Sequence, residues 1–204
     1  NDMTEKEKML SNKLYLASDS TLSLDREKAN LLFFEFNNCD PTNNKKLKVI
    51  IKKLIPHIGN NYRIKPPFFC DYGYNIIIGD NFFANYNCTI LDVAKVTIGD
   101  NVKLAPNVSI FTASHPIDPI IRNTNYEFGV DITIGNNVWI GGNSVINPGV
   151  KIGNNCVIGS GSVVCSDIPD NSIAVGNPCK VVRKLDENDK IFYYKSMSID
   201  ILDK

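Results

Sequence analysis

The sequence predicts a mainly β fold in which short parallel strands stack as the coils of a β-helix. An aliphatic residue recurs every sixth position through the second half of the chain, at Ile134, Ile140, Ile146, Ile152, Ile158 and Val164. Glycine directly follows four of these residues, and asparagine is frequent in the next positions. A spacing of six fits neither a helix nor a simple hairpin, whereas a fixed repeat is typical of solenoids. Each unit therefore predicts a strand that ends at an inward aliphatic side chain, then a turn in which Gly and Asn adopt positive φ.

The same repeat begins earlier in the chain and is interrupted once. It is found at Ile78, Ala84, Ile90 and Val96, slips by two positions, and restarts at Ile98, Leu104 and Ile110. It stops at Phe111 and resumes at Ile132. A coil accepts an insertion only at a corner, so we expect residues 111–131 to project as a loop from a β-helix that spans residues 62–183. The loop carries His115, one of only two histidines.

Helices are expected on both sides of the repeat. Residues 4–57 predict a helical cap that covers the open end of the stack. Its first helix starts at a capping box formed by Thr4 and Glu7. Its second and third helices are expected at about 24–36 and 45–55, the last one ending before Pro56. Residues 184–204 predict a helical tail, with Asp186 capping a helix through Tyr194.

Composition excludes several classes of protein. The 22 basic residues balance the 22 acidic ones, so neither nucleic acid nor an anionic membrane is expected as a general partner. The chain has no apolar run near the ~20 residues that span a bilayer, and it does not begin with an apolar signal segment. Its six cysteines fit no zinc pattern. Reduced thiols in the cytoplasm are therefore expected.

Several segments carry a family resemblance. They are residues 13–19, 34–37, 66–76, 83–87, 105–108, 134–141 and 174–183. These segments resemble the hexapeptide-repeat acetyltransferases, and within that family the maltose, galactoside and nodulation-type O-acetyltransferases, with maltose O-acetyltransferases the most alike. The resemblance implies a left-handed β-helix and a homotrimer with active sites between subunits. It also implies transfer of acetyl from acetyl-CoA to a sugar hydroxyl, without a metal.

Three residues are candidates for the chemistry of this transfer. A hydroxyl needs a base as its proton leaves, and histidine, with an ordinary pKa near ~6.5, suits this task. The resemblance assigns this role to His115. Glu127, in the same insertion, is expected to orient His115, although it could instead hold an acceptor hydroxyl or be solvated. Asn85 matches the amide that stabilises the oxyanion and lines the acceptor pocket, unless it is an ordinary corner asparagine. No acyl-enzyme is expected, and only Cys88 and Cys165 could contradict this.

Acceptor recognition is expected to involve acidic side chains. Asp71 and Asp92 align with family positions that line the acceptor pocket, and turn formation is the alternative for each. Galactoside acetyltransferases have an acceptor-binding acid where this chain has Ala17. Asp19, two positions further on, could replace that acid. This departure weakens a galactoside assignment. Asp71, in the context of residues 70–74, looks more like the maltose acetyltransferases.

Acetyl-CoA binding is expected from a further set of residues. They are Trp139, Gly142, Ser160, Cys165, Lys180 and Arg183. The small residues would let the pantetheine arm approach the coil closely, although these could be ordinary repeat positions. The tryptophan would flank the arm or pack on a neighbouring subunit. The two basic residues would lie near the CoA phosphates.

Other functions on a similar scaffold are less consistent with the sequence. A xenobiotic acetyltransferase is the first alternative, but such relatives usually lack the helical cap. A non-catalytic trimeric scaffold is the second, and the presence of His115 and Asn85 argues against it. A γ-type carbonic anhydrase needs three histidines for zinc, whereas this chain has only His57 and His115. A sugar nucleotidyltransferase needs a nucleotide-binding domain that the sequence does not contain.

Overall fold

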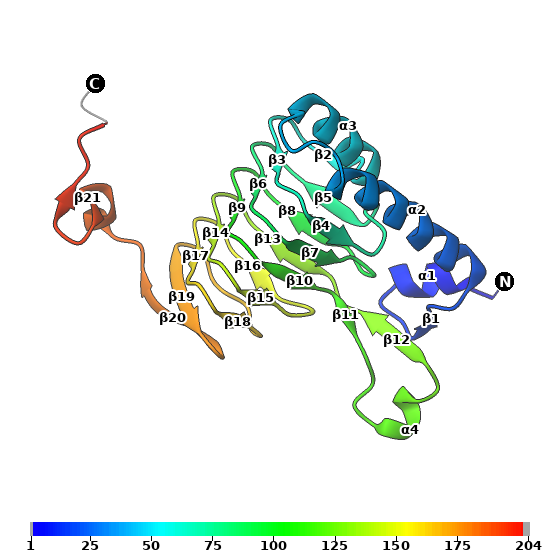
Figure 1. The fold of residues 1–204 in the computed structure, drawn as a ribbon. Helices are drawn as coiled ribbons and strands as arrows, with labels where there is room; N and C mark the ends of the chain where they lie inside the picture. The colour runs from blue at the N-terminus through cyan, green and yellow to red at the C-terminus, as the bar shows by residue number, and fades with distance from the viewer. Residues whose placement is uncertain (1, 202–204) are drawn as a thin grey trace.

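Three parallel sheets form the faces of a β-helix in the computed structural model, which describes residues 2–201 (Figure 1). The first sheet contains β4 (Phe68–Cys70), β7 (Cys88–Leu91), β10 (Ser109–Phe111), β15 (Val145–Ile146) and β18 (Val163–Val164). The second contains β2 (His57–Ile58), β5 (Ile76–Ile78), β8 (Val96–Ile98), β13 (Ile132–Ile134) and β16 (Lys151–Ile152). The third contains β3 (Arg63–Ile64), β6 (Phe83–Ala84), β9 (Lys103–Leu104), β14 (Trp139–Ile140), β17 (Val157–Ile158), β19 (Ser172–Gly176) and β20 (Cys179–Lys184), of which only β20 is antiparallel to its neighbour. The mainly β, parallel fold is confirmed.

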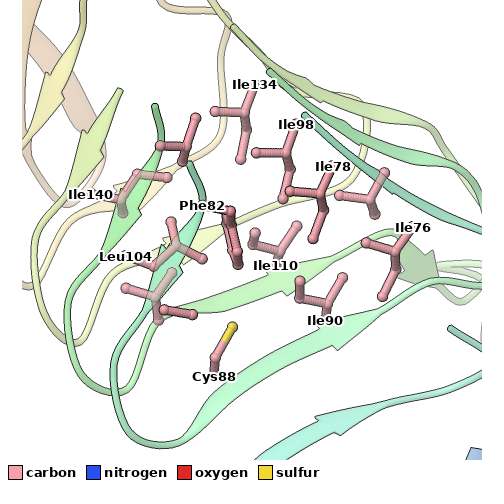
Figure 2. Packing of buried hydrophobic residues seen from close by; sticks show 14 of the residues in the cluster. Ile76, Ile78, Phe82, Cys88, Ile90, Ile98, Leu104, Ile110, Ile134 and Ile140 are labelled. Carbon is pink, nitrogen blue, oxygen red and sulfur yellow. The ribbon is translucent and has the colours of Figure 1, made fainter. Parts of the chain in front are cut away.

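The inward aliphatic residues form columns through the coils. Ile78 pairs with Ile98, and Ile98 with Ile134, so the three side chains stack in register (Figure 2). They are 3%, 2% and 1% exposed. Burying a side chain of this size stabilises a protein by about 1.5–3 kcal/mol. The slip of two positions between Val96 and Ile98 leaves this column in register, because it only adds two residues to one coil.

Asparagine and glycine at the corners have different roles. Asn81, Asn101 and Asn137 have φ of 60°, 56° and 57°, as expected. The side-chain amide of each donates to the next across the coils, at 2.9 Å and 3.0 Å. The expectation of positive φ is wrong for glycines such as Gly79. There, a Cβ would lie 2.9 Å from the carbonyl carbon of Gly99 in the next coil, so close approach of backbones requires glycine.

The helical cap shares a hydrophobic core with the first coils. It consists of α1 (Glu5–Leu10), β1 (Tyr15–Leu16), α2 (Ser20–Asn37) and α3 (Asn44–Leu54). The capping box at Thr4 and Glu7 is present, and α2 begins earlier than predicted because Asp19 caps it. The buried residues Phe36 and Ile51 belong to the same cluster as Ile64 in the coil. The helices therefore cover this end of the β-helix, as expected (Figure 1).

The insertion projects from the β-helix and turns toward the cap. It contains β11 (Ala113–Ser114), α4 (Pro119–Arg122) and β12 (Tyr126–Gly129). Strand β12 pairs antiparallel with β11 on one side and with β1 on the other (Figure 1). The predicted projecting loop is confirmed. Its pairing with the cap was not predicted.

The predicted helix from Asp186 through Tyr194 is wrong. Asp186 does cap a turn, but this is a short 3₁₀ helix, η1 (Glu187–Lys190). The chain then forms a hairpin of β21 (Phe192–Tyr194) and β22 (Met197–Ser198). Consecutive aromatic residues favour strands over helices. Among the helices of residues 2–201, none is long and apolar enough to cross a membrane.

Candidate active site

His115 lies at the start of the projecting loop, directly after β11. Its side chain is 61% exposed, and its Nδ1 atom lies 3.8 Å from Oε2 of Glu127. Antiparallel pairing of β11 with β12 brings the two residues together, since Ser114 pairs with Phe128. The separation is longer than a hydrogen bond but short enough for attraction when the imidazole is protonated. Glu127 is thus placed on the Nδ1 side of the ring.

Glu127 is held by the cap. The hydroxyl of Tyr15 donates to Oε1 of Glu127 at 2.9 Å. Tyr15 is fully buried, and burial together with the charge of Glu127 raises the pKa of its hydroxyl far above the usual range. Tyr15 therefore remains a neutral donor. Sequence reasoning missed it, because 112 residues separate the two partners and only the pairing of β1 with β12 brings them together.

Asp71 follows β4 and lies close enough to Glu127 for their charges to interact. Burial raises the pKa of Asp71 to about 6, while the guanidinium of Arg26 opposes the increase and the charge of Glu127 adds to it. Arg26 donates to the hydroxyl of Tyr72 and to the carbonyl oxygen of Ala17, both at 2.7 Å. The structure thus places an acidic side chain with a raised pKa beside the cap.

Asp92 is enclosed in the protein. It is fully buried, and its Oδ1 accepts the N–H groups of Asp71 and Tyr72 while Oδ2 accepts those of Gly73 and Asn75. The geometry contradicts direct contact between Asp92 and an acceptor, because the carboxylate has no exposed surface. Asp92 instead holds the segment that carries Asp71.

An open hollow of about 480 Å³ lies beside His115. It is lined by Ala17, Ser18, His115, Arg122, Asn123, Asn125 and Glu127. No acidic residue of the cap lines it, which agrees with the departure noted at Ala17. Asp19 does not replace the missing acid, because its carboxylate caps α2 by accepting the N–H of Leu22 at 3.1 Å.

The other predicted residues lie elsewhere on the chain. Asn85 follows β6 on the seven-stranded sheet, and its Oδ1 accepts the N–H of Tyr86 at 2.9 Å. Trp139, in β14 of the same sheet, is 55% exposed. Gly142 and Ser160 occupy one corner of successive coils, since the N–H of Gly161 donates to the carbonyl of Gly142 at 2.8 Å.

The remaining three residues that were expected to bind acetyl-CoA lie in two parts of the chain. Cys165 follows β18, and its thiol accepts from the Asn147 amide at 3.4 Å, so it lies at a different corner from Gly142. Lys180 and Arg183 are both in β20. The guanidinium of Arg183 is bound at 2.8 Å by each carboxylate oxygen of Asp189. Within residues 2–201, no group of three His, Cys, Asp or Glu side chains is arranged to hold a metal ion.

Comparison with known proteins identifies the family. Residues 131–166 match the family model described as bacterial transferase hexapeptide (six repeats), and residues 8–59 match the maltose acetyltransferase hexapeptide capping motif. Galactoside O-acetyltransferase of Escherichia coli (strain K12) is 43% identical over 199 residues, which cover 98% of each chain. The chain belongs to the hexapeptide-repeat acetyltransferases. The resemblance found in the sequence and the expectation of an acyltransferase enzyme are both confirmed.

Two solved structures of relatives resemble this acetyltransferase in sequence and in fold. A maltose O-acetyltransferase from Clostridium difficile 630 has 53% sequence identity and a TM-score of 0.90, over 92% of this chain and 100% of that one. A galactoside acetyltransferase in complex with coenzyme A has 43% identity and a TM-score of 0.94, over 98% and 100% of the two chains. The matches extend over the cap, the coil and the loop that carries His115.

Proposed function

We propose that this acetyltransferase moves the acetyl group of acetyl-CoA to a hydroxyl of a small sugar of the maltose, glucose or galactoside type, with His115 as the general base. The pairing of His115 with Glu127 beside the hollow is the observation that carries the proposal. It gives the imidazole a carboxylate on Nδ1 and leaves Nε2 to accept a proton. The names of relatives that cover nearly the whole chain support the acetyl and sugar assignments.

The proposed reaction is a single acyl transfer. The sugar oxygen attacks the carbonyl carbon of the acetyl thioester as its proton passes to Nε2 of His115. The carbon–sulfur bond then breaks, and the CoA sulfur leaves and takes up a proton. Asn85 would stabilise the intermediate oxyanion through its side-chain amide, and Asp71 would accept a hydrogen bond from the sugar.

Direct transfer without an acyl-enzyme is supported by the state of the cysteines. Burial raises the pKa of the fully buried Cys88 to about 12, so its thiol is a poor nucleophile near neutral pH. Cys165 is exposed, but it directly follows β18 and does not belong to the insertion that carries His115. All six cysteines are free, and this supports a reducing compartment, the cytoplasm.

A homotrimer with sites between subunits is also part of the proposal. His115 and Glu127 lie in the insertion that follows β10 of one sheet. Trp139 belongs to the seven-stranded sheet, and Asn85 and Gly142 follow strands of that sheet. Because these groups lie on different faces of one chain, a neighbouring copy would bring the two sets together. CoA would then lie between subunits, along the corner that contains Gly142, with the basic residues of β20 near its phosphates.

The proposal is tested by measuring CoA release from acetyl-CoA with maltose, glucose, galactosides and chloramphenicol as acceptors. We expect release with a sugar and its loss in His115→Ala, while the matched control His57→Ala, at an exposed strand position, keeps wild-type turnover. Release with chloramphenicol alone would instead support the xenobiotic alternative. Absence of acetyl-CoA binding in the wild-type protein would contradict the proposal.

Mixed trimers test the arrangement between subunits. The His115→Ala and Asn85→Ala variants are unfolded and then refolded together in equal amounts. If each site takes His115 from one subunit and Asn85 from its neighbour, about one quarter of the sites receive both intact residues. Activity near that fraction is expected. Activity no greater than that of the separate variants would show that one subunit supplies both residues.

A further inference from the structure

A second hollow lies between the helical cap and the first coil. Its volume is about 260 Å³, and it shares no lining residue with the hollow at His115. Its apolar wall is formed by Phe36, Leu47, Ile51 and Ile64, which are 0%, 7%, 1% and 5% exposed. These side chains are anchored in the main hydrophobic core, so the wall is preformed.

The rest of the lining combines neutral residues with three cations. Lys48, Arg63 and Lys65 belong to it, and none of its residues is acidic. None of these three cations takes part in the salt bridges found within residues 2–201. The Lys65 ammonium lies 5.0 Å from the ring centroid of Tyr86, so Lys48 and Arg63 are the two cations that we assign to a ligand.

A hydrogen bond beside the hollow links the first coil to helix α3 of the cap. The hydroxyl of Tyr62 in the first coil donates to the carbonyl oxygen of Lys48 in α3 at 2.7 Å. Asp40, the acid next to the lining residue Pro41, accepts both the N–H and the hydroxyl of Thr42 through Oδ1. Its carboxylate is therefore engaged in its own turn.

We propose that this hollow, which we call the cap cavity, binds a small organic anion with an apolar body, such as a monocyclic aromatic or short aliphatic carboxylate. A site with an apolar wall and a few polar groups on one side selects ligands with the same division. Lys48 and Arg63 would hold the carboxylate, while Leu47 and Ile51 would contact the apolar body. At ~30 Å³ for each water-sized group, the volume admits about nine non-hydrogen atoms.

Benzoate is the probe of choice, because it has this size and charge. Benzamide is its neutral match, and inorganic phosphate is an anion without the apolar body. Binding is followed by the NMR shifts of the methyl groups of Leu47, Ile51 and Ile64 in the whole protein, with ligand up to about 10 mM, the weak end of specific binding for so small a molecule. We expect saturable shifts with benzoate, at least about tenfold weaker binding of benzamide, and no methyl shifts with phosphate.

Charge variants locate the site. Lys48→Gln and Arg63→Gln should each weaken benzoate binding about threefold, and the double variant about tenfold, because exposed charge pairs contribute modestly. Lys46→Gln, on the same helix but outside the lining, is the matched control and should bind like the wild type. Circular dichroism confirms that each variant folds.

The proposal would be overturned by the absence of saturable shifts with benzoate, by equal binding of benzoate and benzamide, or by undiminished binding in the folded double variant. Phosphate that shifts the methyl groups as benzoate does would also overturn it, because the apolar wall would then have no role. None of these outcomes depends on acetyl transfer, so failure of the proposed function would leave this test intact.

Discussion

Replacing Asp71 by asparagine should stabilise the folded protein and weaken its binding of acceptor. The carboxylate of Asp71 is held in a partly buried position where burial is the largest influence on its pKa, which rises from 3.8 to about 6. Between these two pH values the folded state binds more protons than the unfolded state. The free energy of unfolding therefore falls as the pH rises through this window.

The size of the effect follows from the pKa difference. Each unit corresponds to about 1.36 kcal/mol, so a rise of about two units gives an upper limit near 3 kcal/mol above pH 6. Because Asp71 retains some exposure, solvent screens part of this effect, and we expect Asp71→Asn to add about 1–3 kcal/mol at pH 8. At pH 4 the native carboxyl is neutral in the folded state, and the variant should gain almost nothing.

Urea unfolding of both proteins at pH 8 and pH 4 measures this difference, at one protein concentration because association contributes to stability. The exposed Asp200→Asn serves as the control and should shift neither midpoint. Equal midpoint shifts for Asp71→Asn at the two pH values, or a loss of stability at pH 8, would refute the reasoning.

The ionisation of Asp71 also predicts that the wild-type KM for a sugar acceptor rises as the pH falls below about 6. KM values that do not change between pH 5 and pH 8 would contradict a role for Asp71 in binding.

Three further substitutions test other parts of the account. Tyr15→Phe removes the hydroxyl that donates to Glu127, and it should lower the free energy of unfolding by about 1.5–3 kcal/mol in a denaturant titration, as expected for a hydrogen bond to a charged group. Asn85→Ala should lower kcat by about 10²–10³ with little change in KM for acetyl-CoA, measured by steady-state CoA release. Gly79→Ala would place a Cβ against Asp100 in the next coil and should destabilise the protein by about 1–3 kcal/mol in thermal unfolding. A Gly79→Ala variant as stable as the wild type would show that neighbouring coils can move apart to accept the added methyl group.

The β-helix was predictable because its signal is repeated. The column that includes Ile78, Ile98 and Ile134 recurs at nearly constant spacing, so one interruption does not obscure it. The reason for glycine after many of the aliphatic residues was not predictable. Close approach between coils is a property of neighbours about twenty residues apart, and the sequence only shows that Gly79 is small.

The proximity of two candidate residues was predictable where one segment carries both. His115 and Glu127 belong to one insertion, and the antiparallel pairing within that insertion brings them together. Tyr15 was missed because its contact depends on a strand of the cap. Asp92 was assigned to the pocket because a family resemblance places a residue near a site without showing whether it is buried.

The most direct test of the account is the turnover of His115→Ala with acetyl-CoA and the best sugar acceptor, set beside the binding of acetyl-CoA to the same protein. If His115 is the general base, kcat should fall by about 10²–10⁴ while the Kd for acetyl-CoA stays close to that of the wild type. Unchanged turnover, or a loss explained entirely by weaker acetyl-CoA binding, would contradict the central claim.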